Sequence, residues 1–584
     1  MIATEREPVP AGPPRGRRFP VAPVLLALVF TALAAATWQR WGHVRIDTGG
    51  ALERAALLAG GAVLYRDVLS PYGPVAEYAM AFLFRTFGVH LDVAYAVGLG
   101  LLAAESALLW SVARRFLGAL ECAVGLAAFW VVLGFAPGPF AWILPNTFAS
   151  TWGAFFATAA LAVLAADLDC PGLAKLVAAS VCIAAAGLSK VEFGVAAFGA
   201  AATHLWLSAR RGRERLIGCA LVVLPGLLLS LAMAAPFVAL VPWRELVDDN
   251  LYRVRSLGPS VTAYNATSLP PFAATVWRAS VRYGVELPLR AALVAAGLGL
   301  AAGSGVRRWL GVLLAGGALL LPLLPGYPPL ADFTRAAVPW QFAWTPAVWL
   351  LVFLWSVFPG RDRSRASTGL ALVGAFSVLL SLRWGGRLLW PAYYGVFAPF
   401  LAVGLVRTIA ARAGGGRAPL AAALVLALPT VMLAVNHRVE YGWQSFAVVA
   451  PRGTLWTLEP EGRPLQGVID FVRAHTSPGD SVAVLPEERL INFLAERPHP
   501  TPDPGVGPGW LATPADVERF VRQLETRQPR LVVVSNRRYP EFRAGEFGSY
   551  CPDVMRWLEQ HYVRVWTTGS SMIRYDVYAP ATPP

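Results

Sequence analysis

About thirteen apolar segments of membrane-spanning length recur between residues 21 and 436, and they constrain the fold more than any other feature of the sequence. An α-helix needs about 20 mostly apolar residues to cross the hydrocarbon core of a bilayer. The segments fall near 21–38, 91–113, 119–136, 145–167, 173–189, 191–209, 216–241, 287–304, 308–325, 336–358, 366–383, 388–408 and 418–436. They predict a polytopic α-helical membrane protein whose transmembrane domain occupies residues 21–436.

The composition agrees with this class, because 56% of the residues are hydrophobic and only 15% are charged. Soluble domains average about 25% charged residues. The net charge of +14 would suggest a nucleic-acid partner in a soluble protein. Here it reflects arginines at loop ends, so we exclude nucleic acid. Five scattered cysteines show no metal-ligand spacing, which argues against a disulfide framework and a zinc site. The first 20 residues are rich in Pro and Arg, and we expect them to form a disordered cytoplasmic tail.

Arginine placement predicts the orientation of the chain, because cytoplasmic loops are enriched in Lys and Arg. With the N-terminus inside, alternating spans place every short arginine-rich loop on the cytoplasmic side. Counting 74–88 as another span would move the later clusters outside. We therefore interpret 74–88 as an interfacial or re-entrant helix, with Arg85 reaching toward the headgroups. Residues 39–90 (the first outer loop) and everything after residue 436 are then predicted to be extracytoplasmic.

The segment 437–584 has the pattern of a small soluble α/β domain. Helical spacing covers 465–475, 515–527 and 553–562, β-branched runs cover 481–486 and 529–536, and 563–580 indicates a closing hairpin. Strand–helix alternation predicts a small, mostly parallel sheet. Glu487, Glu488 and Asn492 are expected to cap a helix in this domain.

Two residues near the predicted outer surface admit both a structural and a chemical role. Asp47 is the first acidic residue after the first span, and it precedes a helical Ala/Leu run. It suits a helix N-cap, and it equally suits a base acting on a substrate at the membrane surface. Lys190 is one of only two lysines and lies at the turn between 173–189 and 191–209. It is either an interfacial lysine paired with Glu192 or a compact cation for a phosphate.

Other charged residues on the predicted outer side leave similar alternatives open. Arg335 and Arg387 are suited to bidentate phosphate binding, or they serve as interface anchors near aromatic side chains such as Tyr393. Asp248 and Asp249 form a second acidic site, a pair of metal ligands or part of a solvated loop.

The first outer loop carries a family resemblance in the run DTGGALERAALLAGGAVLYRDVLSPYGPVAEYAMAFLFRTFG, residues 47–88. This run resembles the first outer loop of GT-C superfamily glycosyltransferases, in particular bacterial relatives of protein O-mannosyltransferases and lipid A aminoarabinose transferases. The matching residues are Asp47, Gly61, Tyr65, Arg66, Asp67, Tyr72, Gly73, Pro74 and Gly88. The mannosyltransferases have Asp-Glu where this chain has Asp47-Thr48, so the arrangement around the acceptor differs here.

The resemblance implies an inverting glycosyltransferase with a GT-C-like transmembrane domain in a bacterial plasma membrane. Its expected donor is a polyprenyl-phosphate-linked hexose or pentose, and its expected acceptor is a hydroxyl of a protein, lipid or glycan. Asp47 would be the catalytic base, and the donor phosphate would be bound by Lys190, Arg335 and Arg387. Substrate contacts would come from Tyr65, Arg66, Asp67, Glu192 and Tyr393. The resemblance implies no certain cofactor. Whether a divalent metal takes part is left open.

Two other classes compete with this reading. A lipid or polysaccharide transporter would call for internal repeats with broken helices in matching halves, and the sequence shows none. A non-catalytic membrane assembly protein would keep the fold and lose the site residues.

Overall fold

The computed structural model describes residues 21–243, 365–383, 395–412 and 418–581, together with short pieces between 246 and 314. Within those ranges it leaves out residues 44, 46–47, 139–140, 169–171, 209–211, 504, 512, 540–541 and 543. Three predicted spans, near 287–304, 308–325 and 336–358, therefore lie wholly or largely outside the described residues.

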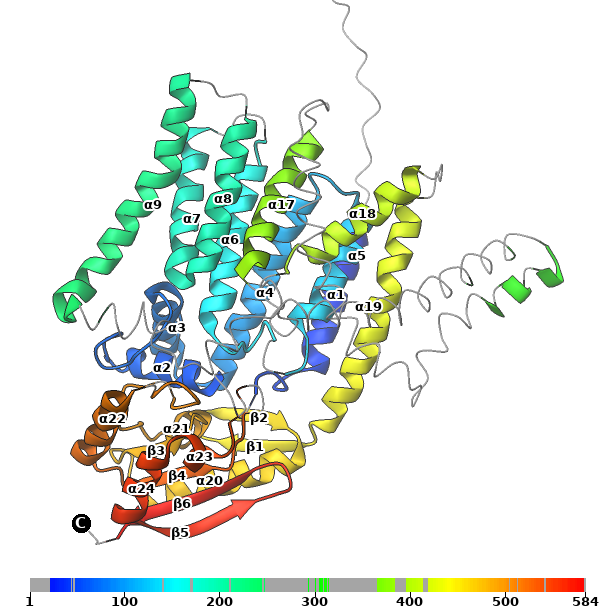
Figure 1. The fold of residues 1–584 in the computed structure, drawn as a ribbon. Helices are drawn as coiled ribbons and strands as arrows, with labels where there is room; N and C mark the ends of the chain where they lie inside the picture. Colours follow the sequence, from blue (N-terminus) through cyan, green and yellow to red (C-terminus); the bar gives the residue numbers. More distant parts are fainter. Residues whose placement is uncertain are drawn as a thin grey trace, which may run out of the picture.

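The described part is a helical bundle with a mixed α/β domain at one end (Figure 1). The bundle helices are α1 (Val21–Ala36), α4 (Leu91–Ala113), α5 (Ala119–Phe129), α6 (Phe148–Ala165), α7 (Leu173–Ser189), α8 (Val191–Leu207), α9 (Gly212–Leu240), α17 (Arg365–Arg383), α18 (Ala398–Arg412) and α19 (Ala418–Trp443). A π-helical turn, η1 (Trp130–Gly134), continues α5. Each helix falls on an apolar segment predicted from the sequence, which confirms these helices and the mostly helical fold class.

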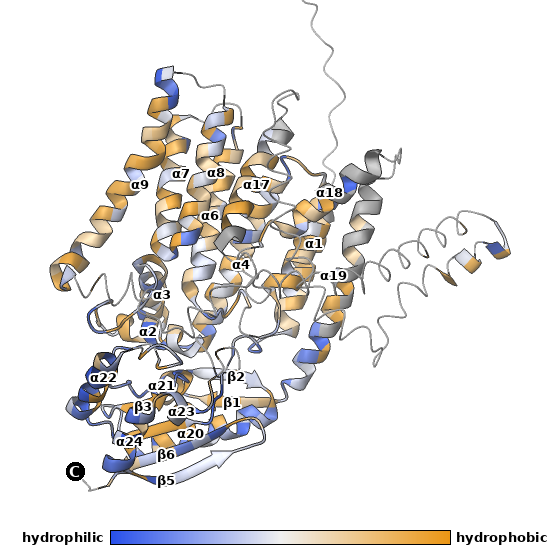
Figure 2. Cartoon of the chain, viewed as in Figure 1, coloured by the Kyte–Doolittle hydropathy of each residue, from blue (hydrophilic) through white to orange (hydrophobic). Residues whose placement is uncertain are grey.

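Hydropathy separates the same two parts, because the bundle helices are mostly hydrophobic and the C-terminal domain is more hydrophilic (Figure 2). Among the described helices, α4, α6 and α9 are long and apolar enough to cross a membrane, and α7, α8 and parts of α1, α5 and α17 are shorter apolar helices. The count of thirteen spans stays a prediction. The starts of α9 and α19 lie at the end of the bundle furthest from the C-terminal domain (Figure 1). Arg213 and Arg215 in the first turn of α9 thus lie far from that domain, as the arginine pattern requires.

Two short helices of the first outer loop, α2 (Thr48–Ala59) and α3 (Pro74–Phe87), lie between the bundle and the C-terminal domain (Figure 1). Pro74 suits the first position of α3, where its missing N–H costs nothing. Gly88, with φ of 96°, ends this helix. At 14 residues α3 is shorter than a span, which agrees with our interpretation of 74–88.

The C-terminal domain contains two sheets. A hairpin of β1 (Phe446–Ala450) and β2 (Gly453–Thr457) follows α19 directly. The second sheet has the order β3-β4-β6-β5, formed by β3 (Val482–Leu485), β4 (Leu531–Ser535), β6 (Arg574–Pro580) and β5 (Tyr562–Gly569). The helices are α20 (Glu459–His475), α21 (Leu490–Ala495), α22 (Pro514–Arg527), α23 (Phe547–Tyr550) and α24 (Pro552–His561).

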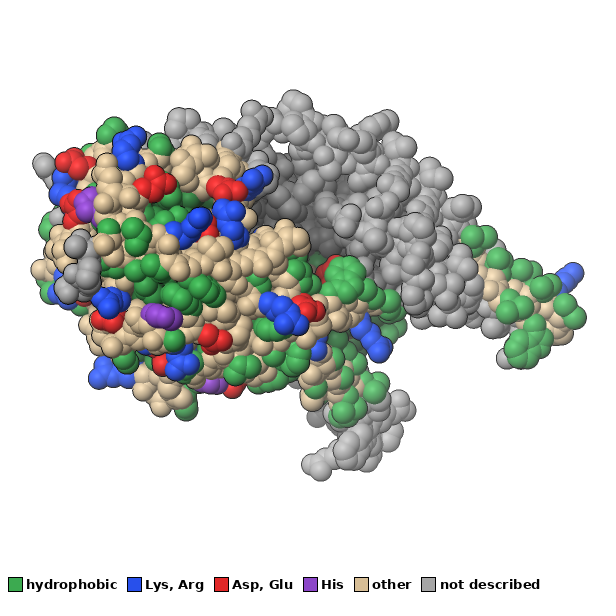
Figure 3. Space-filling model, turned by 90° about the horizontal axis from the view of Figure 1, so that it is seen from below, with side chains coloured by type: hydrophobic (Ala, Val, Ile, Leu, Met, Phe, Trp, Pro, Cys, Tyr) green, Lys and Arg blue, Asp and Glu red, His purple; other side chains and the backbone are tan. Residues whose placement is uncertain are grey.

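The predicted helices, strands and closing hairpin of this domain are confirmed, but the prediction of a mostly parallel sheet is wrong. Only β3 and β4 pair in parallel, whereas β4–β6 and β5–β6 are antiparallel. The reason is the hairpin itself, which returns the chain so that β6 runs against β4. Seen from below, this domain presents basic and acidic side chains interspersed with apolar ones (Figure 3).

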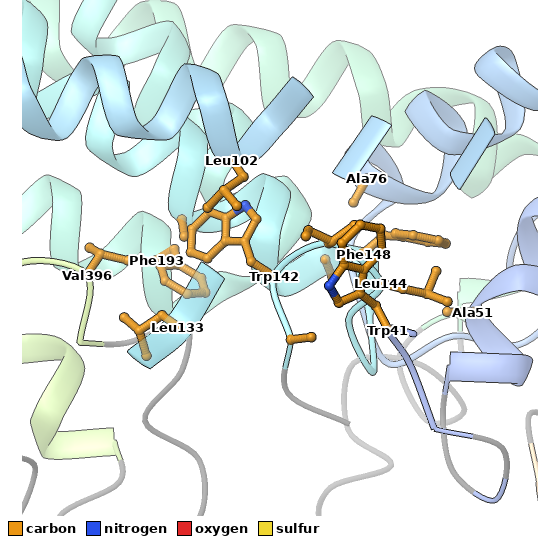
Figure 4. Close-up of a cluster of buried hydrophobic side chains, with 14 of the residues drawn as sticks. Trp41, Ala51, Ala76, Leu102, Leu133, Trp142, Leu144, Phe148, Phe193 and Val396 are labelled. Atoms are coloured by element: carbon orange, nitrogen blue, oxygen red, sulfur yellow. The ribbon is translucent and has the colours of Figure 1, made fainter. Parts of the chain in front are cut away.

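An apolar core lies where the first outer loop meets the bundle (Figure 4). Trp41, Leu144 and Phe148 lie together there, and Trp142 packs nearby with Leu102 and Phe193. Trp41 and Trp142 are fully buried. Because Trp142 and Leu144 precede α6 and Phe148 is its first residue, the core fixes the start of α6 against the start of the loop.

Candidate functional site

Lys190 lies in the turn between α7 and α8, where its extended backbone separates the two helices. Its Nζ donates a hydrogen bond to Ser150 Oγ at 3.0 Å, in the first turn of α6. The same atom lies 3.6 Å from Glu192 Oε1 and 5.4 Å from the centre of the Tyr72 ring. The side chain is only 14% exposed. The expected pairing with Glu192 is therefore present, and it helps to hold this ammonium in place together with Ser150 and Tyr72.

The start of α6 adds a second source of positive potential. Thr147 caps the helix, accepting a hydrogen bond from Ala149 N. Asn146 is 3% exposed, and its Oδ1 has no hydrogen-bond partner among the described residues. A helix N-terminus carries partial positive charge and attracts anions. The ammonium of Lys190 and the N-terminus of α6 thus lie together and supply positive potential, which the Glu192 carboxylate partly offsets.

The loop before α3 closes over this site. Gly73 N donates to Ser189 O at 3.2 Å, which fixes the loop on the α7–α8 turn. A Cβ at Gly73 would lie 1.9 Å from Leu188 O, so only glycine allows this approach. This contact places the ring of Tyr72 over Lys190. Tyr65 OH donates a 2.6 Å hydrogen bond to Tyr72 O and so stabilises the position of Tyr72.

The neighbouring pair Arg66 and Asp67 faces solvent, with side chains 49% and 39% exposed and joined at 2.8 Å. Hydrogen bonds from Arg66 hold the pKa of Asp67 below its usual range. Asp67 Oδ2 also accepts from Val63 N at 2.8 Å. In the structure, these two residues therefore stabilise the loop tip and make no contact with Lys190.

Thr48, the first residue of α2, connects the loop to the same site. Its Oγ1 donates to Pro145 O at 3.3 Å, just before α6 begins. Thr48 directly follows Asp47 in the sequence. Asp47 itself, Arg335, Arg387 and Tyr393 lie outside the described residues, as do Asp248 and Asp249. The structure thus brings together Lys190, Glu192 and, through Tyr72, Tyr65.

The C-terminal domain positions α2 through a buried ion pair that sequence reasoning missed. Arg489 Nη1 lies 3.5 Å from Glu53 Oε2, and both side chains are below 10% exposed. His499 N donates to the other oxygen of Glu53 at 3.2 Å. Burial raises the pKa of Glu53 and lowers that of Arg489 to about 10. The signal was the charge pair Glu53-Arg54 inside an Ala/Leu run, since charges in an apolar helix indicate buried partners.

Arg54 and the tail residues complete this interface. Arg54 Nε lies 3.2 Å from Glu77 Oε1 in α3. The expectation that Glu487, Glu488 and Asn492 cap a helix is wrong. Glu487 pairs with Arg537, Glu488 accepts from Ser535 Oγ, and Asn492 Nδ2 donates to the carbonyls of Val482 and Arg497, all tying loops to the sheet. Among the described residues, no group of three or more His, Cys, Asp or Glu is placed to hold a metal ion.

The overall fold is similar to that of a solved membrane-protein structure of the class that the first outer loop resembles. No protein-family model matches the chain, and a comparison with curated protein sequences finds no match. Among solved structures, the oligosaccharyltransferase of Archaeoglobus fulgidus in its apo form is similar, with a TM-score of 0.50 and 14% identity. The match covers 96% of this chain and 74% of that chain.

Two further solved structures are similar at lower TM-scores. ArnT from Cupriavidus metallidurans bound to undecaprenyl phosphate has a TM-score of 0.44 and 15% identity, and the match covers 96% of this chain and 98% of that one. AglB from Archaeoglobus fulgidus, in complex with an inhibitory peptide and a dolichol-phosphate, has a TM-score of 0.47 and 12% identity, with 96% and 74% covered. These likenesses concern the fold alone.

Proposed function

We propose that the protein is a glycosyltransferase that moves a sugar from a polyprenyl-phosphate donor to an acceptor hydroxyl outside a bacterial plasma membrane. The observation that supports this most is the position of the Lys190 ammonium, which contacts the first turn of α6 and the ring of Tyr72. A cation held there suits a phosphate that gains charge as its bond to the sugar breaks. The GT-C fold, known in proteins bound to undecaprenyl phosphate or a dolichol-phosphate, supports the same donor class.

The reaction needs a proton acceptor at the attacking hydroxyl, and we assign this role to Asp47. The acceptor oxygen bonds to the anomeric carbon, the bond to the lipid phosphate breaks, and the hydroxyl proton passes to the Asp47 carboxylate. A single displacement of this kind inverts the anomeric carbon. Lys190, with Arg335 and Arg387, would stabilise the departing lipid phosphate.

The donor site is tested by Lys190→Ala. The chain offers a matched control in Lys175, the only other lysine, which pairs with Asp167 at 3.3 Å and is 41% exposed. Binding of undecaprenyl phosphate to the purified protein, measured by native mass spectrometry, should weaken about 10-fold or more in Lys190→Ala. Lys175→Ala should leave it unchanged. Equal affinities in the two variants would assign Lys190 a purely structural role.

The base is tested by Asp47→Asn. A general base contributes about 10²–10⁴-fold to the rate, so sugar transfer should fall by that order while undecaprenyl phosphate still binds. Asn caps a helix as well as Asp, so a capping role predicts full activity. Unchanged transfer would therefore leave Asp47 a capping role only, whereas absence of sugar transfer in the unsubstituted protein would favour a transporter or an assembly protein over an enzyme.

A further inference from the structure

A pocket of about 590 Å³ opens where the C-terminal domain meets the segment that follows α1. Pockets for small ligands commonly measure about 300–1,000 Å³, so this one suits a saccharide with a charged substituent. Its lining includes three arginines and no acidic residue: His43, Arg45, Asn536, Arg537, Arg538 and the β5–β6 turn at Ser571 and Met572.

The pocket lies at the position where α/β sheets bind ligands. Residues 536–538 follow β4 directly, and β4 is paired in parallel with β3. Ligands of open α/β sheets bind outside the carboxyl ends of such parallel strands. The topology of the sheet therefore supports a binding role independently of the charges.

Each of the three arginines is held by an ion pair with a glutamate. Arg45 pairs with Glu461, whose side chain is 7% exposed. Arg537 Nη1 lies 2.5 Å from Glu487 Oε1, and Arg538 Nη2 lies 3.0 Å from Glu546 Oε1. None of these carboxylates lines the pocket, whereas all three arginines do. Guanidinium groups fixed in this way are suited to bidentate binding of phosphate or carboxylate.

His43 adds a neutral donor. Its Nδ1 accepts a hydrogen bond from Arg45 N at 3.2 Å, which assigns the ring proton to Nε2. Burial lowers the pKa of His43 to about 4, so the ring is neutral at pH 7. The Nε2–H can therefore donate to a bound ligand without adding charge.

The pocket is connected to the proposed base through the backbone. Arg537 also donates a hydrogen bond to the carbonyl of Arg45. Arg45 lies two residues before Asp47 in the sequence. The C-terminal domain thus holds Arg45 in place through Arg537, and both arginines line the pocket.

We propose that this pocket binds the anionic group of the acceptor, a phosphate or carboxylate carried on a saccharide. The role as acceptor site rests on the proposed transferase function, whereas binding of an anionic saccharide does not. The saccharide is either soluble or the headgroup of a lipid, and both present the same chemistry to the arginines.

Binding to the full-length protein in phosphatidylcholine nanodiscs tests the proposal. By saturation-transfer NMR, glucose 6-phosphate and glucuronate should bind and glucose should not. Arg538→Gln should weaken glucose 6-phosphate about 10-fold, and because Arg538 is 70% exposed the fold should survive this change. Arg556→Gln is the matched control, since Arg556 is 64% exposed and pairs with Asp553 in α24, away from the pocket. Equal binding of glucose and glucose 6-phosphate, or equal effects of the two substitutions, would overturn the proposal.

Two further arms assign the source and separate this proposal from the transferase function. Nanodiscs containing phosphatidylinositol 4-phosphate compete with glucose 6-phosphate if a lipid headgroup is accepted, and fail to compete if the ligand must be soluble. Both results support the anionic site, and only the source differs. Lys190→Ala should weaken undecaprenyl phosphate and spare glucose 6-phosphate, while Arg538→Gln should do the reverse. A protein that binds glucose 6-phosphate but transfers no sugar retains the anionic site and loses its assignment as an acceptor site.

Discussion

Replacing Gly73 by alanine should disturb the loop over Lys190 while leaving the helices intact. The added Cβ would lie 1.9 Å from Leu188 O, whereas real Cβ contacts are essentially never under 3.0 Å. The loop and the α7–α8 turn must therefore separate by about 1.1 Å, the difference between these two distances. Leu188 O is a backbone atom and the position of the Cβ is fixed by the backbone of residue 73, so no side-chain rotation relieves the contact. Tyr72 and Lys190 lie on the two sides of this contact and would move apart.

The expected cost follows from that displacement. Forcing an extra methyl group into a packed contact costs about 1–3 kcal/mol, and a misplacement of about 1 Å at a site can cost about 10²-fold in rate. Gly172 is a matched control, because it is also a helix N-cap, with φ −63° and ψ 158° against −71° and 165° at Gly73. No described atom lies within 4 Å of its Cβ position.

The assay compares Gly73→Ala with Gly172→Ala in thermal unfolding and in undecaprenyl phosphate binding. Both variants carry the same small penalty for alanine at an N-cap, so their difference isolates the contact with Leu188. Gly73→Ala should unfold at lower temperature and bind the lipid phosphate more weakly. Equal behaviour of the two variants would refute the argument that this close approach positions Tyr72 over Lys190.

Three further predictions concern the C-terminal domain and its contact with the first outer loop. Arg489→Met should destabilise the protein by about 3–5 kcal/mol by leaving Glu53 charged and buried, and adding Glu53→Gln should recover part of this loss in a thermal double-mutant cycle. Gly49→Ala should separate α2 from α21, since its Cβ would lie 2.1 Å from Leu490 N, and protease access to the tail should increase; unchanged protection would contradict this packing. Burial lowers the pKa of His43 from 6.5 to about 4. As the pH falls from about 6.5 to about 4, the unfolded chain therefore binds a proton at His43 before the folded protein does. The free energy of unfolding should fall by up to about 3 kcal/mol over this pH range. His43→Gln should remove this component, and an unchanged pH dependence of unfolding would contradict it.

Sequence reasoning located what depends on local pattern. Apolar segments of spanning length and helical spacing in the tail identify elements because burial and period are properties of neighbouring residues. Lys190 stood out because lysine is so rare in this chain. The β1–β2 hairpin was missed, since its strands are short and its turn at Gly453, with φ of 126°, carries no strong signal.

The remaining features depend on contacts between distant segments. Ser150 and Lys190 are 40 residues apart, and Tyr72 reaches the same ammonium from another loop. Nothing in the local sequence specifies which helix start faces which turn. The prediction of a mostly parallel sheet was wrong for the same reason. The partner of β6 is set by the return of the β5–β6 hairpin and by packing against β4, which lies earlier in the chain.

The pairing of Glu53 with Arg489 can form only late in the synthesis of the chain. These residues are 436 positions apart. At about 5–20 residues per second, ribosomes make the intervening chain in between about 20 and 90 s. During that interval α2 has left the ribosome while the segment that buries it has not been synthesised. The newly made first outer loop must therefore wait, with its acidic side chain hydrated, until the last quarter of the protein emerges and closes over it.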